Sequence, residues 1–99
     1  MSKKIPDKVG KWKLFEKQEG INIPEPVVRV TWKHKTAVNE YGNPLFLQLE
    51  KTKGIYVGDD RWEFRAPYGF AGYNKYFPGN EFEYALEHAI EWMERHQDL

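Results

Sequence analysis

Hydrophobic residues near the C-terminal end of the chain recur with the spacing of one helix face. With successive residues about 100° apart on a helical wheel, seven apolar residues fall in or at the margin of one arc: Phe82, Ala85, Leu86, Ala89, Ile90, Trp92 and Met93. Pro78 and Gly79 interrupt regular structure just before this segment, and Asn80 followed by Glu83 matches a capping box. The pattern therefore predicts an amphipathic helix over residues 80–99, which needs an apolar surface to lie on.

Apolar and polar residues alternate in several earlier segments, which predicts strands. We expect strands over residues 11–17, 27–35, 45–51, 55–57 and 61–65, with turns at 41–44, 52–54 and 58–60. Pro67 ends the last strand, and residues 66–79 are predicted to form an irregular loop rich in glycine and aromatic residues.

The predicted fold is α+β, a four- to five-stranded antiparallel meander sheet with one C-terminal amphipathic helix packed on a single face. Residues 1–9 are expected to form a flexible basic tail, with Ile5 or Val9 as candidates to contact the domain. The remaining residues 10–99 are long enough for one domain and too short for two.

The two faces of the predicted sheet differ in character. One face is apolar and forms the expected core beneath the helix: Trp12, Leu14, Val28, Val30, Trp32, Leu45, Leu47, Leu49, Ile55, Val57, Trp62 and Phe64. The opposite face combines eight basic residues with three aromatic ones: Lys11, Lys13, Lys17, Arg29, Lys33, Lys35, Arg61 and Arg65, with Phe15, Phe46 and Tyr56. Only Glu50 and Glu63 oppose this positive charge on the same face.

The net charge of zero hides an uneven distribution along the chain. Residues 1–35 carry nine Lys or Arg against four Asp or Glu, whereas residues 81–99 carry one against six. The chain has no cysteine, no apolar run long enough to cross a membrane, and charges where a signal peptide needs an apolar stretch. We therefore expect a cytoplasmic protein without a membrane partner.

Catalytic and metal-binding patterns are weak. The only serine is Ser2 in the predicted tail, so a serine or cysteine nucleophile beside a base is not expected. His88 and His96 are eight residues apart, which is not the spacing of two metal ligands on adjacent helical turns, and His34 is distant in the sequence. The sequence favours a binding protein without cofactor or metal over an enzyme.

The basic and aromatic sheet face suggests binding of nucleic acid, single-stranded or structured RNA or DNA, because lysine and arginine contact phosphates while aromatic rings stack on bases. The candidate residues are Lys11, Lys13, Phe15, Arg29, Lys33, Phe46, Tyr56, Arg61 and Arg65. The alternative is a protein-interaction or inhibitor module that uses the acidic helix and the aromatic loop 66–79. Its candidate residues are Tyr73, Tyr76, Tyr84, Glu87 and Glu91. The sequence leaves the oligomeric state open.

Overall fold

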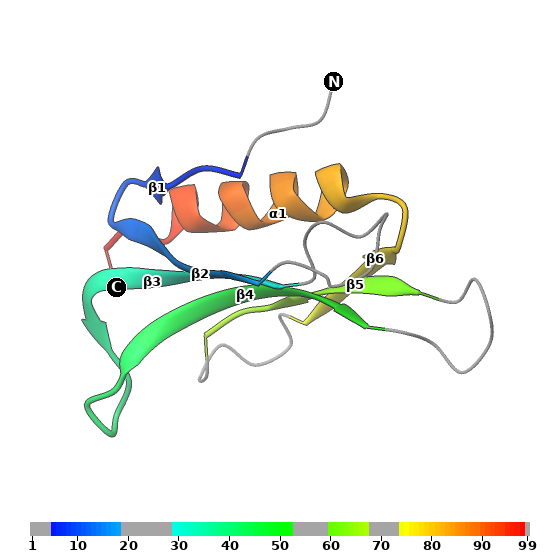
Figure 1. Ribbon diagram of the computed structural model, residues 1–99. Coiled ribbons are helices and arrows are strands. Elements are labelled where there is room, and N and C mark those ends of the chain that lie inside the picture. Colours follow the sequence, from blue (N-terminus) through cyan, green and yellow to red (C-terminus); the bar gives the residue numbers. More distant parts are fainter. Residues whose placement is uncertain (1–4, 19–28, 53–59, 68–73, 99) are drawn as a thin grey trace.

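Alternating side chains build an antiparallel sheet whose strands follow one another in chain order, with a single helix across one face (Figure 1). The computed structural model describes residues 5–18, 29–52, 60–67 and 74–98. The elements are β1 (Lys8–Val9), β2 (Trp12–Gln18), β3 (Arg29–Val38), β4 (Pro44–Thr52), β5 (Arg61–Arg65), β6 (Lys75–Pro78) and α1 (Phe82–Arg95). The predicted α+β meander with one helix on one face is confirmed.

The described part of the sheet has six strands, where four to five were predicted. The first addition is β1, whose two residues pair with β2 through Lys8 opposite Lys13 and Val9 opposite Trp12. The second is β6, which pairs with β5 inside the segment predicted to be an irregular loop. Both are too short to show a period in the sequence. The strand predicted over residues 55–57 lies outside the described residues.

Residues 5–9, which were assigned to the N-terminal tail, pack on the domain. Ile5 and Val9 lie against the core. The indole N–H of Trp32 donates to the carbonyl oxygen of Pro6 at 3.1 Å. The apolar side chains in this segment and its backbone hydrogen bonds therefore tie it to the sheet and the helix.

The core lies between α1 and the sheet, as the strand alternation predicted. Trp32 is the register partner of Leu47, and both are fully buried on the face beneath α1. Leu86 and Met93 of the helix are also fully buried, whereas Ile90, which was predicted to be buried, is only partly so. Trp92, placed at the margin of the apolar arc, belongs to the core.

The helix begins one residue later than the predicted capping box requires, with Glu81 in place of Asn80 as the N-cap residue. The Glu81 side chain makes no capping hydrogen bond. The helix start is instead set by the chain leaving β6, where the N–H of Glu81 donates to the carbonyl oxygen of Pro78 at 2.9 Å. Tertiary packing of α1 on the sheet thus outweighs the local capping preference.

A β-bulge in β2 changes which residues share a face. Leu14 is opposite Trp32 and Glu16 is opposite Thr31, so Phe15 is the additional residue on the β2 side. Beyond the bulge the alternation is reversed, and Lys17 is opposite the buried Val30. Lys17 was predicted to lie on the outer face, and this assignment is wrong because a bulge shifts the parity of every residue that follows it.

Candidate nucleic-acid interface

Three lysines form a row across adjacent strands on the outer face of the sheet. Lys8 of β1 is opposite Lys13 of β2, which is in turn opposite Lys33 of β3. Directly opposed residues in an antiparallel pair have Cα atoms only about 4.5–5.5 Å apart, and like charges so placed repel each other. None of these lysines forms an ion pair with a residue that the structure describes. We call Lys8, Lys13 and Lys33 the lysine row.

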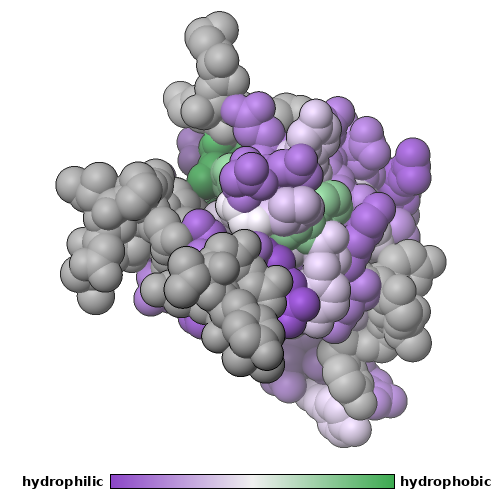
Figure 2. Space-filling model, turned by 90° about the vertical axis from the view of Figure 1, so that its right-hand side faces the viewer, coloured by the Kyte–Doolittle hydropathy of each residue, from purple (hydrophilic) through white to green (hydrophobic). Residues whose placement is uncertain are grey.

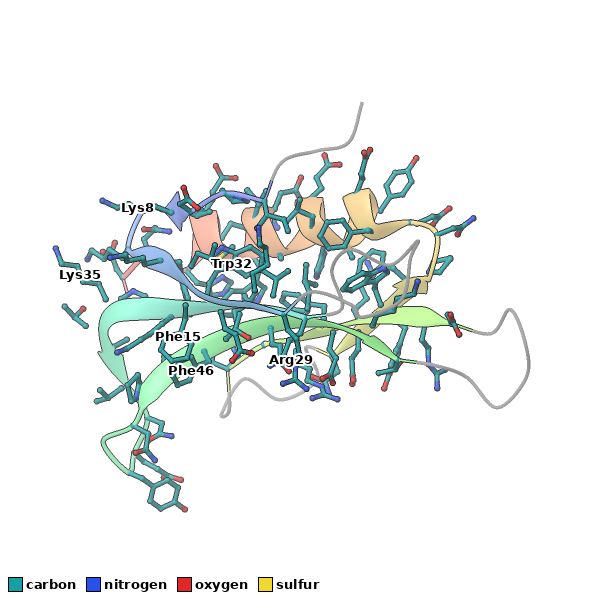
Figure 3. All side chains as sticks on the ribbon, viewed as in Figure 1. Lys8, Phe15, Arg29, Trp32, Lys35 and Phe46 are labelled. Atoms are coloured by element: carbon teal, nitrogen blue, oxygen red, sulfur yellow. The ribbon has the colours of Figure 1, made fainter. Side chains whose placement is uncertain are left out.

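An aromatic pair continues the lysine row onto β4. Phe46 is the register partner of Lys33, and the bulge in β2 places Phe15 beside it. The two rings meet edge to face with centroids 5.1 Å apart, and the Lys33 ammonium lies 6.0 Å from the Phe15 ring centre. Phe15 is 59% exposed and Phe46 is 37% exposed, so both rings present area to solvent. Figure 3 shows them side by side on the face of the sheet opposite Trp32.

The lysine row and Phe15 line an open groove of about 620 Å³ at the β1–β2–β3 end of the sheet. The other lining residues are Gly10, Lys11, Leu14, His34 and Lys35. Lys35 is exposed and, like the lysine row, has no ion pair among the described residues, whereas Lys11 pairs with Asp98 at 3.0 Å. The groove therefore combines several available ammonium groups with an apolar ring.

Carboxylates occupy the other half of the outer face and pair with two of the predicted phosphate ligands. Arg29 bonds Glu50 through two guanidinium nitrogens. Arg65 contacts Glu50 at 3.2 Å and Glu63 at 2.7 Å. The hydrogen bond to Glu63 and the field of Glu50 raise the pKa of Arg65 above its ordinary value. Both guanidinium groups are thus already paired with carboxylates of the protein. The outer face is divided into a lysine half, which carries the lysine row, and an ion-paired half, which carries these arginines and glutamates.

The other residues predicted to bind nucleic acid do not line the groove. Arg61 lies on β5 with its guanidinium 4.8 Å from the ring centre of Tyr76. Tyr76 in turn donates a hydrogen bond to Glu63 at 3.1 Å. Tyr56 lies outside the described residues. The structure therefore brings together Lys13, Lys33, Phe15 and Phe46, places Lys11 beside them, and separates Arg29, Arg61 and Arg65 from them.

The alternative protein-binding residues do not form one surface. Tyr76 shares the outer sheet face with Glu63, while Tyr84, Glu87 and Glu91 lie on exposed positions of α1, on the other side of the sheet. Tyr73 lies outside the described residues. Viewed from the end at which α1 begins, the described surface is mainly hydrophilic, with hydrophobic residues in small patches (Figure 2).

Two groove residues were missed in the sequence. Lys8 falls in the predicted tail because a two-residue strand shows no alternation in the sequence, and its position just before the apolar Val9 is the one signal of pairing. His34 has the same parity as Trp32 on β3, so the alternation in the sequence places it on the core face. It is 1% exposed and lies on the floor between the groove and the core.

His34 joins β3 to the end of the chain. Its Nδ1 accepts the backbone N–H groups of Ala37 at 2.9 Å and Thr36 at 3.2 Å. Nε2 therefore carries the proton and donates to the carbonyl oxygen of Gln97 at 2.8 Å. This imidazole is held in one tautomer by backbone partners, which is a structural role.

The Gln97 side chain completes this connection at the β1–β2 turn. It accepts the N–H of Lys11 at 2.6 Å and donates to the carbonyl oxygen of Val9 at 3.1 Å. Gly10 in the turn has φ +59°, and a Cβ there would lie 1.9 Å from the Gln97 Oε1 atom. The positive φ favours glycine here, and a Cβ would displace the Gln97 amide from its hydrogen bonds. The C-terminal segment thus supports the strands that carry Lys8 and Lys13.

The third histidine, His88, packs against the sheet. Its ring lies 4.7 Å from Phe64 and 5.6 Å from Phe77, measured between ring centres. Burial lowers the pKa of His88 below its ordinary value, and the Lys75 ammonium lowers it further. His88 lies outside the apolar arc predicted for the helix, yet it is half-buried because β6 lies along this flank of α1.

Comparison with known proteins gives no relative: no protein family, curated protein or solved structure matches this chain. Among the described residues, no three His, Cys, Asp or Glu side chains are grouped as a metal site would need. The described part of the chain also contains no helix with the length and apolarity needed to span a membrane.

Proposed function

We propose that this protein binds single-stranded nucleic acid in the groove lined by the lysine row and Phe15, with Phe46 beside Phe15 at its margin. The observation that carries the proposal is the lysine row itself, in which three like charges stand on adjacent strands without a carboxylate partner among the described residues. Such an arrangement costs folding free energy. A bound polyanion would remove this repulsion.

The aromatic pair favours nucleic acid over other polyanions. Exposed rings next to ammonium groups allow a base to stack while the neighbouring phosphates meet lysines, and stacking contributes about 1–3 kcal/mol per base. In a duplex the base faces are already stacked on each other and cannot reach Phe15 or Phe46. The site therefore favours a single strand or an unpaired loop.

The ion-paired half of the outer face bounds the site. Glu16, Glu50 and Glu63 lie on the same face as the lysine row but toward the other end of the strands. Their carboxylates repel phosphate, so a strand bound along the whole face would lose affinity. The favourable path crosses the strands from β1 to β4, over Lys8, Lys13, Lys33 and Phe46.

Fluorescence anisotropy with labelled oligonucleotides tests the proposal. We expect the wild-type protein to bind an oligothymidylate of about ten nucleotides, and to bind it more tightly than a duplex of the same length. For three phosphate contacts, log K should fall against log salt concentration with a slope of roughly −2, measured between about 50 and 200 mM salt. Absence of binding at the lower salt concentration would exclude this function.

A pair of double variants locates the site. Lys13→Gln with Lys33→Gln should weaken binding and flatten the salt dependence, because two phosphate contacts are lost. The matched control is Lys17→Gln with Arg95→Gln, which removes the same charge from exposed positions away from the groove. Equal losses in both double variants would indicate nonspecific attraction to positive charge.

A protein partner on α1 is the second candidate function, favoured by one observation. Tyr84 is 62% exposed on the acidic outward face of the helix, where Glu87 and Glu91 are also exposed. Exposed tyrosines are frequent anchors in protein interfaces. Replacement of Tyr84 by Ala should then release a co-purifying protein without lowering thermal stability.

A further inference from the structure

The β3–β4 hairpin bends away from the plane of the sheet beyond the aromatic pair. Lys33 is opposite Phe46, but Val38 is opposite Pro44, so β3 contains three more residues than β4 between these two register pairs. Extra residues on one strand bend and twist it. Figure 1 shows the hairpin end turning to the side of the sheet opposite α1. This is the side on which Phe15 and Phe46 lie (Figure 3).

The bend has its own internal support. The backbone N–H groups of Thr36 and Ala37 donate to the His34 ring, as described above. Ala37 is buried against the core, while Val38 is 56% exposed. The direction of the hairpin is therefore determined by the buried imidazole and by Ala37.

The tip of the hairpin is also held in one conformation. The Asn39 side-chain oxygen accepts the N–H of Tyr41 at 2.9 Å and that of Asn43 at 3.0 Å. The Asn39 N–H donates to the Asn43 carbonyl oxygen at 2.8 Å, and Gly42 takes φ +82°, which favours glycine. Tyr41 stands at this braced tip and is 72% exposed, more than any other large hydrophobic residue described.

We propose that Tyr41 is a second stacking platform and that the ligand is a single strand reaching from the lysine row across Phe46 to the hairpin tip. This inference rests on the proposed function. A bound strand gains affinity from a further base only if a second ring lies beyond the Phe15–Phe46 pair, and Tyr41 supplies that ring. Because the hairpin tip is already ordered in the folded protein, binding does not have to order it.

The spacing sets a minimum length for the ligand. Tyr41 in the turn and Phe46 on β4 are five residues apart, which spans at most roughly 17 Å at about 3.3 Å per residue. Successive phosphates of an extended single strand are roughly 6–7 Å apart, so two to three nucleotides bridge the two rings. Together with the nucleotides on the lysine row, the site should need about six nucleotides for full affinity.

Oligonucleotide length provides the test. Tyr41→Ala should weaken binding of an oligothymidylate of about ten nucleotides by at least about fivefold, which corresponds to the loss of one stacked base. It should leave binding of an oligothymidylate of about three nucleotides unchanged, because that ligand cannot reach the tip. Tyr41→Trp should retain the affinity for the longer strand and Tyr41→Leu should not, since only tryptophan keeps an aromatic face.

Tyr84→Ala is the matched control, because Tyr84 is similarly exposed but lies on α1, across the sheet from the groove. Tyr84→Ala should change neither the affinity for the longer strand nor that for the shorter one. The inference is overturned if Tyr41→Ala binds the longer strand as tightly as wild type does, or if its affinity for the short and the long strand falls by the same factor. If the lysine double variant loses binding while Tyr41→Ala does not, the proposed function stands and only the hairpin platform fails. Absence of wild-type binding would remove both.

Discussion

Lys13 and Lys33 are register partners on β2 and β3, and neither forms an ion pair with a described carboxylate. A few residues further along the same two strands, Glu16 and Arg29 lie within 3.9 Å of each other as an ion pair. The outer face thus contains both compensated and uncompensated charge. This contrast leads to separable effects on stability and on binding.

Removal of one charge from the lysine row should stabilise the fold. Lys13→Gln relieves repulsion with both Lys8 and Lys33, and we expect the free energy of unfolding to rise by about 0.2–1 kcal/mol. Urea denaturation at low salt measures this difference, and high salt should reduce it. A destabilised Lys13→Gln protein would show that the row is already neutralised within the molecule.

Arg29 and Lys33 share one strand face but should respond oppositely to truncation. Arg29→Ala leaves the half-buried Glu50 without one of its two arginine partners, so we expect a loss of about 1–3 kcal/mol in stability and a small change in nucleic-acid binding. Lys33→Ala should keep or raise stability and weaken binding. Thermal melts and anisotropy on the same two proteins check this separation, which a uniform basic surface would not produce.

Truncation of Met93 should cost more stability than truncation of Ile90 on the same helix. Met93 is fully buried, so Met93→Ala should cost about 2–5 kcal/mol. Ile90 is only partly buried, and Ile90→Ala should cost less. Denaturant unfolding of both variants gives the comparison, and a larger loss for Ile90→Ala would contradict the observed packing of α1.

The contact between His34 and Gln97 should stabilise the whole β1–β2–β3 end. His34→Ala leaves the N–H groups of Thr36 and Ala37 without their acceptor and opens a cavity, so we expect a loss of about 2–4 kcal/mol. Gln97→Ala removes the side-chain bonds to Val9 and Lys11 but keeps the backbone carbonyl that His34 contacts, and it should cost less. Denaturant unfolding of the two variants tests this order.

Stability should fall with acidification partly through His88. Its pKa is lowered in the folded protein, so the unfolded chain binds a proton more readily. The associated stability is fully present above the ordinary value of about 6.5 and is lost as the pH falls from there through the folded pKa. We expect His88→Gln to show a shallower decline of melting temperature between pH 7.5 and pH 5 than wild type. Parallel declines in the two proteins would contradict this role.

The sequence by itself determined the helix, the meander and the core face of β3, β4, β5 and the first half of β2. These features depend on periods of about 3.6 and 2 residues, which are properties of local backbone geometry and can be read without knowing any partner. For this reason Trp32, Leu47 and Met93 were placed correctly in the core, and Lys13, Lys33, Phe15 and Phe46 were placed together on the outer face.

Only the tertiary structure decided how the outer face is divided. The bulge at Phe15, the partners of Arg29 and Arg65, and the bend after His34 all depend on which residues become opposed across strands. Cross-strand register involves residues distant in the sequence, and one extra residue reverses every later position. Lys8 joins Lys13 and Lys33 in the lysine row only through the pairing of β1 with β2. A strand as short as β1 has no period that the sequence could show.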